Sequence, residues 1–260
     1  MTLKPINIDI SSYPPELQPL LTSSDIYDSS CSPDAKVIFI QKDGGYFLKT
    51  APKGKLESEA VMTRYFHGKG LSANVLAYIS NESDYMLTEK IRGDDCTTAK
   101  YLENPKRLCD TIAERLLLLH AMDFSDCPVQ NRTRRYIASA EKNKQAGIVN
   151  MKNLAGSGYN TPEEAWRVVE TKGHLLQDDT LLHGDYCLPN IILDDWHFSG
   201  FIDFDEGGVG DRHIDIFWGA WTLLFNLDTD KYRARFFDAY GRDKIDEERL
   251  KIISAIAVFG

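Results

Sequence analysis

A short pattern near residue 190 constrains this chain more than any other feature. His183-Gly184-Asp185 is followed by Asn190, five residues beyond the aspartate, and Asp203 follows thirteen residues after that asparagine. A carboxylate beside a hydroxyl group can orient it and accept its proton, and Mg²⁺ prefers carboxylate and amide oxygens as ligands. The pattern therefore predicts a site where Asp185 accepts a proton while Asn190 and Asp203 bind Mg²⁺, as phosphoryl transfer requires.

Length and composition describe an ordinary globular chain. Its 260 residues can bury a sizeable core as one large domain or as two lobes, and 43% hydrophobic with 27% charged residues is typical of such proteins. No apolar run approaches the roughly 18 residues that a membrane-spanning helix needs, and residues 1–21 lack the basic start and apolar stretch of a signal peptide. We therefore expect neither secretion nor a membrane partner.

Cysteine usage and net charge indicate the cellular compartment and the class of partner. The five cysteines are scattered, without the paired spacing of a metal site or the density of a disulfide scaffold. They predict reduced thiols in a cytoplasm. A net charge of −9 without a cluster of Lys and Arg argues against a nucleic-acid partner, because binding to a phosphate backbone depends on clustered positive charge. The acidic balance favours cationic partners, though only weakly.

The first 90 residues predict antiparallel strands with one helix. Residues 1–22, which contain Pro14-Pro15, favour an irregular or briefly helical lead-in. Apolar residues at near-helical spacing predict a helix over 55–66, which Gly68 or Gly70 would end. Runs rich in β-branched and aromatic residues, separated by turn residues, predict two hairpins, from strands 36–40 with 46–49 and 74–79 with 85–88.

Helical patterns dominate after Arg92-Gly93. Thr161-Pro162-Glu163-Glu164 is a strong helix start, with a capping residue, a proline at the first position and acids in the first turn. Short apolar runs place the His183 and Asp203 motifs on a loop–strand–turn–strand–loop unit, whose turn is residues 194–197. The predicted helices are 106–121, 132–144, 161–172, 212–226, 229–240 and 246 to the end. The elements together predict an α+β protein.

Four segments carry a family resemblance. Residues 183–190, 199–203, 210–216 and 119–128 resemble the aminoglycoside 3′-phosphotransferases, bacterial enzymes that move the γ-phosphate of ATP to a sugar hydroxyl of kanamycin-type antibiotics. The resemblance extends from about Ser30 over nearly all of the remaining chain. It implies a protein-kinase-like fold of two lobes, with a mainly antiparallel nucleotide-binding lobe at 1–91 and a helical catalytic and substrate-binding lobe at 92–260.

The resemblance also implies roles for individual residues. Asp185 matches the catalytic aspartate, and Asn190 and Asp203 match the two Mg²⁺ ligands. His183 is expected to brace the loop by hydrogen bonds, and Asp215 matches a structural acid that secures the catalytic loop without binding metal. ATP is the implied phosphate donor, with GTP as the alternative.

A lysine at the end of a predicted strand is the implied phosphate contact. Lys49 matches the residue whose ammonium holds the α- and β-phosphates, although a strand-end lysine on its own is usually a solvated surface charge. A carboxylate that pairs with it would hold the cation in place. Glu59 is the preferred partner, and Glu57, on another face of the same helix, is the competitor.

Adenine contacts are implied at the join between the lobes. Residues 87–91, including Glu89 and Ile91, resemble the segment whose backbone groups hydrogen-bond adenine. Phe47 falls where the family places an aromatic ring on the adenine face; the alternative is a residue packed in the core of the small lobe. Ser32, in the loop before the first strand, is a further candidate phosphate contact.

The chain departs from the family in ways that bear on the metal and the substrate. Asp205 and Glu206 stand where relatives usually carry Gly and often Arg, so the extra carboxylate either gives the metals another oxygen or points away. Trp221 stands where an Arg is frequent, residues 151–160 hold no acid, and residues 255–260 lack the acidic pair that holds the drug's ammonium groups in relatives. The loss of such partners would weaken binding of a polycation.

The preferred interpretation is an ATP- and Mg²⁺-dependent O-phosphotransferase that acts on the 3′-hydroxyl of an aminoglycoside and so confers antibiotic resistance. Its partner would be a cationic small molecule. One alternative is a kinase of another hydroxylated metabolite such as choline, homoserine or a sugar, which the missing acids favour. The other is a nucleotide-binding homologue without activity, which the changes at Asp205 and Glu206 keep open.

Overall fold

The computed structural model describes residues 4–31 and 35–260. The chain divides into two compact units. The sheet unit comprises residues 1–94 together with 192–205, and the helical unit comprises 95–191 together with 206–260. The segment 192–205, which carries Asp203, thus belongs with the N-terminal residues, whereas the division expected from the sequence placed it with the C-terminal part.

A six-stranded antiparallel sheet forms the body of the sheet unit, in the order β1-β2-β3-β4-β6-β5. Both predicted hairpins are present, as the β3–β4 and β5–β6 pairs. The segment 192–205 adds the hairpin of β9 and β10, whose turn residues Asp195 and Trp196 both have positive φ, as the tightest hairpin turns require. The strands are β1 (Lys4–Pro5), β2 (Asp25–Asp28), β3 (Lys36–Gln41), β4 (Tyr46–Pro52), β5 (Val75–Ser80), β6 (Ser83–Glu89), β7 (Asp94–Asp95), β9 (Ile191–Asp194) and β10 (His197–Phe201).

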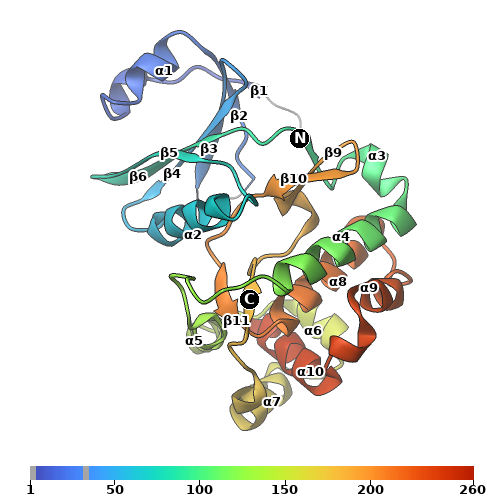
Figure 1. Ribbon diagram of the computed structural model, residues 1–260. Coiled ribbons are helices and arrows are strands. Elements are labelled where there is room, and N and C mark those ends of the chain that lie inside the picture. The colour runs from blue at the N-terminus through green and yellow to red at the C-terminus, as the bar shows by residue number, and fades with distance from the viewer. Residues whose placement is uncertain (1–3, 32–34) are drawn as a thin grey trace. The chain divides into compact units, whose positions relative to one another are not determined.

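Side chains alternate between the two faces of this sheet, and each face is covered by a helix. Leu48 of β4 and Leu87 of β6 enter an apolar cluster with Leu17 and Leu21, beside the short helix α1 (Gln18–Thr22). Neighbouring residues point the other way, and Ala51 and Met86 pack with residues of α2 (Glu57–Gly68). Figure 1 shows α1 and α2 on opposite sides of the sheet.

The briefly helical lead-in that the sequence allowed is present as α1, but this segment also contains strands that were not predicted. The lead-in contains α1, a 3₁₀ turn at Ile10–Ser12 and the strands β1 and β2. A five-residue helix with a proline at its second position is too short to show helical periodicity. Burial of Leu17 and Leu21 against the sheet stabilises it instead, and burial of one such side chain contributes about 1.5–3 kcal/mol.

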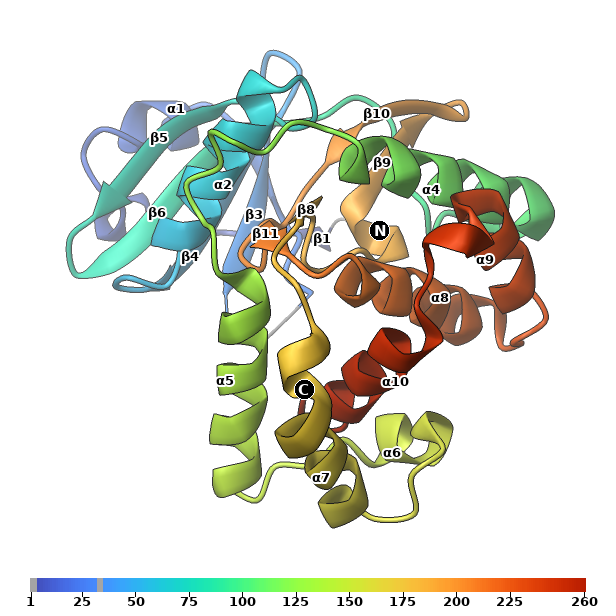
Figure 2. The ribbon, with the colours of Figure 1, turned by 60° about the horizontal axis from the view of Figure 1, so that its bottom comes forward.

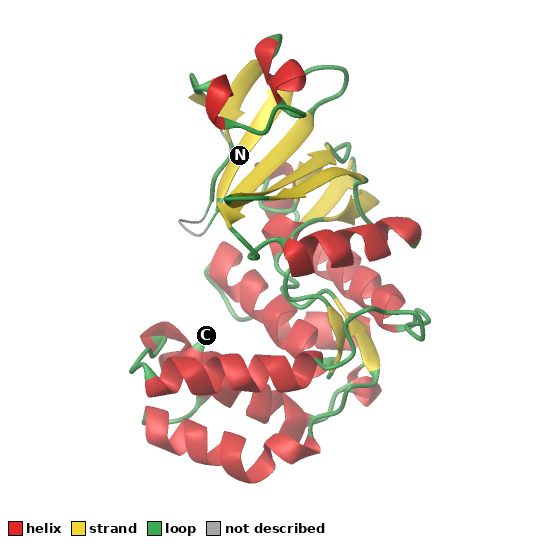
Figure 3. Cartoon of the chain, turned by 90° about the vertical axis from the view of Figure 1, so that its left-hand side faces the viewer, coloured by secondary structure: helices red, strands yellow, loops and turns green. Residues whose placement is uncertain are grey.

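Eight helices described in the helical unit account for most of its residues (Figure 3). Figures 1 and 2 show α4 packed beside α9 and α7 beside α10. The helices are α3 (Ala99–Leu102), α4 (Pro105–His120), α5 (Arg132–Gln145), α6 (Met151–Ser157), α7 (Pro162–Lys172), α8 (His213–Leu227), α9 (Arg233–Tyr240) and α10 (Glu247–Ile256). Short 3₁₀ turns lie at Gly173–Leu175, Leu188–Asn190, Arg242–Lys244 and Ala257–Phe259, and β8 (Thr180–Leu182) pairs with β11 (Gly208–Gly210).

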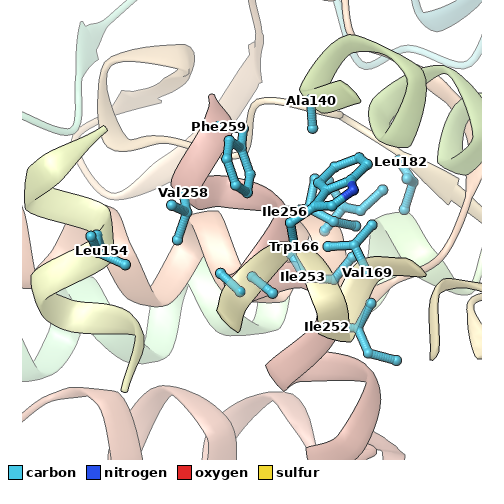
Figure 4. Packing of buried hydrophobic residues seen from close by; sticks show 13 residues of the cluster. Ala140, Leu154, Trp166, Val169, Leu182, Ile252, Ile253, Ile256, Val258 and Phe259 are labelled. Carbon is cyan, nitrogen blue, oxygen red and sulfur yellow. The ribbon is translucent and has the colours of Figure 1, made fainter. Parts of the chain in front are cut away.

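The core of the helical unit gathers α7, α10 and the residues that follow α10. Figure 4 shows Trp166 of α7 against Ile253 and Ile256 of α10, and the rings of Trp166 and Phe259 meet edge to face with their centroids 5.4 Å apart. The backbone carbonyl of Phe259 accepts a hydrogen bond from the Asn143 side chain at 2.7 Å. Residues 257–259 are therefore part of the folded core.

Two helix predictions need correction. The helix predicted over 229–240 begins only at Arg233. The helix α6 was not predicted, because its seven residues are too few to show an amphipathic pattern. Asn150 caps its first turn through a hydrogen bond to the Asn153 N–H, and Gly158 ends it with φ 83°. Within residues 4–31 and 35–260, no helix is both long and apolar enough to cross a membrane.

Candidate active site

Strand β4 directs Lys49 toward helix α2. Phe47, Lys49 and Ala51 share one face of the strand, and Ala51 packs with residues of α2. The Lys49 ammonium donates to the Glu59 carboxylate at 2.7 Å and to the Asp203 carboxylate at 3.0 Å. The sheet unit thus brings together three residues that lie up to 154 positions apart in the chain.

The three charged groups influence one another because Glu59 is buried and the Lys49 side chain is only 20% exposed. The Glu59 side chain is 5% exposed, and burial raises its pKa to about 7 despite the nearby Lys49 charge. Burial acts to lower the pKa of Lys49, but the facing Asp203 and Glu59 carboxylates outweigh it and hold that pKa above its ordinary value. Two carboxylates share one ammonium, so the cluster carries an excess of negative charge only above about pH 7, where Glu59 is ionised.

Glu59 and Glu57 occupy different faces of α2, as their spacing predicts. Glu59 lies in the buried first turn of the helix, whereas Glu57 is exposed. The geometry therefore favours Glu59 over Glu57 as the partner of Lys49. A buried, hydrogen-bonded ion pair limits where the lysine ammonium can lie.

Asp203 holds a strained backbone conformation in an exposed position. Its φ is 66°, in the left-handed region that aspartate tolerates better than most residues. The next residue, Phe204, is fully buried and stacks on Phe66 of α2 with ring centroids 4.2 Å apart. This anchor leaves the Asp203 side chain 46% exposed, with one oxygen on Lys49 and the carboxylate open to solvent.

The loop of residues 183–190 brings Asp185 and Asn190 together in the helical unit. The Asn190 side-chain nitrogen donates to the Asp185 carboxylate at 2.8 Å and to the Asp185 backbone carbonyl at 3.0 Å. Because the nitrogen makes both bonds, the amide oxygen of Asn190 is the atom suited to bind a cation. The Asp185 N–H donates to Nδ1 of His183 at 3.3 Å, so His183 does brace the loop.

A buried carboxylate fixes the start of this loop. Asp215, in the first turn of α8, accepts the backbone N–H of His183 on one oxygen and that of Gly184 on the other, both at 2.8 Å. Further along, the buried Tyr186 hydroxyl donates to the Ile112 carbonyl of α4 at 2.7 Å. The loop that presents Asp185 is thus held by two helices.

Asp215→Asn is expected to loosen this loop. An amide has only one accepting oxygen, so one of the two buried N–H groups would lose its partner, at a cost of about 1–3 kcal/mol in the free energy of unfolding. We also expect kcat to fall, since the same bonds position Asp185. Urea denaturation and steady-state kinetics measure both effects.

Asp246→Asn is the matched control for that substitution. Asp246 caps α10 through a single oxygen, which accepts the N–H groups of Glu248 and Arg249. Asparagine caps helices equally well, so stability should change by no more than about 0.5 kcal/mol. Equal effects of the two substitutions would show that the paired N–H contacts of Asp215 are unimportant.

His120 is buried against the same carboxylate and makes stability depend on pH. Its Nε2 lies 3.2 Å from Asp215 and its Nδ1 lies 2.8 Å from the Tyr240 hydroxyl. Burial lowers the pKa of His120 below its ordinary value of 6.5, even though Asp215 opposes that shift. The folded chain therefore resists a proton that the unfolded chain takes up near pH 6.5, and stability is lost as the pH falls below that value.

The expected loss from His120 is up to about 1.4 kcal/mol at pH 5.5 compared with pH 7.5 or above. Urea denaturation of the wild-type protein and of His120→Gln at a series of pH values isolates this contribution, because other titrating groups are shared. The curve of the variant should be flatter by up to that amount between pH 7.5 and 5.5. Parallel curves would show that His120 titrates alike in the folded and unfolded chains.

A cavity of about 200 Å³ lies beside Asp185, entirely within the helical unit. Its wall combines the catalytic loop with aromatic and small residues of α5 and α8. The described residues that line it are Tyr136, Ser139, Ala140, Gly184, Asp185, Glu206, Trp218, Ile256, Phe259 and Gly260. Such a mixture of apolar surface and a few polar groups is typical of a small-molecule site.

Asp205 and Glu206, the two residues that differ from the usual family pattern, make different contacts. The backbone carbonyl of Asp205 accepts a hydrogen bond from Ser58 Oγ of α2 at 3.2 Å. The Glu206 carboxylate forms an ion pair with Arg132 of α5 and lines the cavity beside Asp185. The carboxylate of Glu206 is therefore engaged by a cation of this chain.

The remaining predicted nucleotide contacts lie on or next to β4 and β6. Phe47 is half-buried, with its ring 5.2 Å from that of Phe39, and it shares its face of β4 with Lys49. Glu89 is exposed at the end of β6, opposite Tyr46, and Ile91 follows it half-buried. Ser32 lies outside the described residues. The structure thus places Phe47 on the lysine side of the sheet.

Sequence reasoning missed the aromatic wall of the cavity. Tyr136 and Trp218 occur in helical patterns where an apolar residue ordinarily indicates core packing, so no local signal separates them from the core. The family resemblance assigned no functional role to Tyr136 or Trp218 either. Cys187 is buried, and burial raises its pKa, which is consistent with a packing role and not with a nucleophile.

Comparisons with known proteins match most of the chain. A family model described as the phosphotransferase enzyme family matches residues 31–253. A protein of Lactococcus lactis subsp. lactis, named "Probable aminoglycoside 3′-phosphotransferase", is 52% identical over 259 residues, which cover 99% of each chain. The aminoglycoside 3′-phosphotransferase of Niallia circulans is 30% identical over 210 residues, which cover 79% of this chain and 80% of that protein.

Solved structures agree on the fold. The aminoglycoside phosphotransferase APH(3″)-Id from Streptomyces rimosus, in complex with ADP and streptomycin, matches with a TM-score of 0.69 at 22% identity, over 86% of this chain and 91% of that one. The predicted protein-kinase-like α+β fold is thereby confirmed. A family match across most of the chain, and a relative that is half identical along nearly its whole length, show that this phosphotransferase enzyme belongs to the aminoglycoside phosphotransferase family.

Proposed function

We propose that the chain transfers the γ-phosphate of ATP, with Mg²⁺, to the 3′-hydroxyl of an aminoglycoside. The observation that carries this proposal is the Asp185–Asn190 pair, held by Asp215 and opening onto a cavity of about 200 Å³. The names of the two most similar relatives described above support the choice of acceptor. A cytoplasmic location remains a prediction from the sequence.

Asp185 is the proposed catalytic residue. Its carboxylate orients the acceptor hydroxyl and takes its proton as a new bond forms between the acceptor oxygen and the γ-phosphorus. The bond between the γ-phosphorus and its bridging oxygen breaks, and ADP leaves. Asn190 fixes the Asp185 carboxylate through the 2.8 Å hydrogen bond. Part of the entropy loss on orienting this carboxylate therefore occurs before the substrate binds.

Lys49 is the proposed ligand of the α- and β-phosphates. Its ammonium is oriented by the buried Glu59 and carries its charge at neutral pH, because its pKa lies above the ordinary value. The phosphates would share the ammonium with Asp203, which holds it at 3.0 Å. Phe47, on the same face of β4, and the backbone of Glu89 and Ile91 are the proposed adenine contacts. Ser32 remains a candidate phosphate contact.

Asn190 and Asp203 are the proposed Mg²⁺ ligands. Their amide and carboxylate oxygens are ligands that the ion prefers, and the Asp203 side chain is 46% exposed, so a bound ion can reach it. Mg²⁺ in such sites is usually bound by one or two protein side chains together with substrate phosphates and water. When bound, Mg²⁺ neutralises charge on the phosphates during transfer.

A division of labour follows from this assignment. The sheet unit supplies the nucleotide contacts and one metal ligand, and the helical unit supplies the catalytic aspartate, the other metal ligand and the acceptor cavity. We propose that both sets act on one nucleotide. The boundary near residue 94 and the inclusion of residues 192–205 with the sheet unit are consistent with this scheme.

A coupled ADP-release assay tests the proposed reaction. Kanamycin and neomycin, with ATP or GTP and Mg²⁺, should give turnover at kcat/KM of about 10⁴ M⁻¹s⁻¹ or more, as is usual for a physiological substrate. Nuclear magnetic resonance of the product should place the phosphate on the 3′-oxygen. Choline and homoserine are the competing acceptors, because residues 151–160 contain no acid. Turnover of these alone would overturn the assignment, and no turnover with any acceptor would favour an inactive homologue.

A further inference from the structure

Glu206 is a charged residue of the cavity that the proposed reaction does not use. Of the ten described residues that line the cavity, the side chains of Asp185 and Glu206 are the charged ones, and both are carboxylates. Asp185 is committed to the acceptor hydroxyl. The Glu206 side chain is 50% exposed, so its carboxylate can meet a ligand.

Arg132 holds this carboxylate in place. The Arg132 side chain is 7% exposed and pairs with Glu206 from the first turn of α5. A carboxylate can accept about four hydrogen bonds, and one guanidinium supplies at most two of them. Glu206 therefore retains accepting capacity on its exposed side.

The backbone at Glu206 is also fixed against the catalytic loop. A side-chain carbon at Gly184 would lie 1.7 Å from the Glu206 carbonyl oxygen, so the two segments are in direct contact. Asp185 follows Gly184 immediately. The carboxylate of Glu206 thus has a defined place next to the residue that would receive the acceptor hydroxyl.

We propose that Glu206 binds an ammonium group of the acceptor and so determines specificity for amino sugars. This inference rests on the proposed function. It assigns to Glu206 the kind of contact that residues 151–160, which hold no acid, do not supply. The aromatic side chains of Tyr136 and Trp218 line the same cavity, and an aromatic ring can favour a cation over a neutral sugar.

Glu206→Gln separates the charge from the shape of the side chain. The amide still accepts from Arg132, so the fold should be kept, which thermal denaturation verifies. An ammonium–carboxylate contact contributes favourable free energy to binding. Its loss should therefore raise the KM and the calorimetric Kd for kanamycin about tenfold. The KM for ATP and kcat should stay within twofold, because the proposed nucleotide contacts and the proposed proton acceptor are other residues.

Two further variants make the test specific. Glu206→Asp keeps the charge and should recover most of the affinity for kanamycin. Glu141→Gln removes the same charge from an exposed site on α5 outside the cavity wall and should leave the Kd within twofold. A tenfold effect from Glu141→Gln as well would indicate long-range electrostatics and would overturn the direct contact.

The outcomes also separate this inference from the proposed function. If the wild-type enzyme phosphorylates kanamycin and Glu206→Gln leaves both KM and Kd within twofold, the contact is wrong while the function stands. If Glu206→Gln mainly lowers kcat or raises the KM for ATP, Glu206 positions the loop through Arg132 and does not bind the acceptor. If the wild-type enzyme does not use kanamycin, the proposed function itself fails.

Discussion

Asp185→Asn is expected to lower kcat by about 10²–10⁴-fold, the usual contribution of a positioned general base. The amide keeps the size of the side chain and can still contact Asn190, but it cannot take the proton of the acceptor hydroxyl. The calorimetric Kd for Mg²⁺ and a non-hydrolysable ATP analogue should change by less than threefold, because the proposed phosphate contact is Lys49. The coupled ADP-release assay with kanamycin measures the loss of turnover.

Asp195→Asn is the control for this experiment. Asp195 is an exposed turn residue with φ 47° in the β9–β10 hairpin, and asparagine tolerates that conformation equally well. Activity should remain near the wild-type value. If Asp185→Asn also kept near-wild-type turnover, the mechanism assigned to Asp185 would be wrong. If it abolished nucleotide binding, Asp185 would have a structural or metal-binding role instead.

Gly184→Ala is expected to destabilise the chain by on the order of 4 kcal/mol and to abolish turnover. Gly184 has φ 90°, which costs another residue about 1–3 kcal/mol. The added carbon would also lie 1.7 Å from the Glu206 carbonyl oxygen, so the backbone must move, at a further cost of about 1–3 kcal/mol. That movement would displace Asp185, the adjacent residue. Urea denaturation and the ADP-release assay measure the two effects.

Gly158→Ala isolates the cost of backbone conformation. Gly158 ends α6 with φ 83°, close to that of Gly184, but a side-chain carbon there meets nothing within 4 Å. It should lose only about 1 kcal/mol and keep its activity. Similar losses from the two substitutions would show that the contact between Gly184 and Glu206 relaxes easily and does not fix the catalytic loop.

Much of the candidate site could be predicted because several of its residues lie close together in the sequence. The Asp185–Asn190 pair joins two ends of one short loop, so five residues of separation suffice to bring the side chains together. The hairpins of β3–β4 and β5–β6 follow from short alternating strands around turn residues. Glu59 was preferred over Glu57 only by resemblance, and the burial of one face of α2 supplies the physical reason.

Features that depend on distant contacts could not be predicted. Only the family resemblance placed Asp203 and Lys49 in one site, because no local pattern encodes a contact between residues 154 positions apart. The ion pair of Glu206 with Arg132 likewise links a loop to a helix that precedes it by more than 70 residues. The short helices α1 and α6 depend on packing and on single capping residues, which composition does not reveal.

The central claim is that Lys49 and Asp203 act with Asp185 and Asn190 on a single Mg²⁺-bound nucleotide. A crystal structure with a non-hydrolysable ATP analogue, Mg²⁺ and kanamycin tests it most directly. The account predicts the Lys49 ammonium on the α- and β-phosphates, Mg²⁺ bound by oxygens of both Asn190 and Asp203, and the Asp185 carboxylate within hydrogen-bond distance of the 3′-hydroxyl. A nucleotide bound away from Lys49, or kanamycin with its 3′-hydroxyl remote from Asp185, would contradict it.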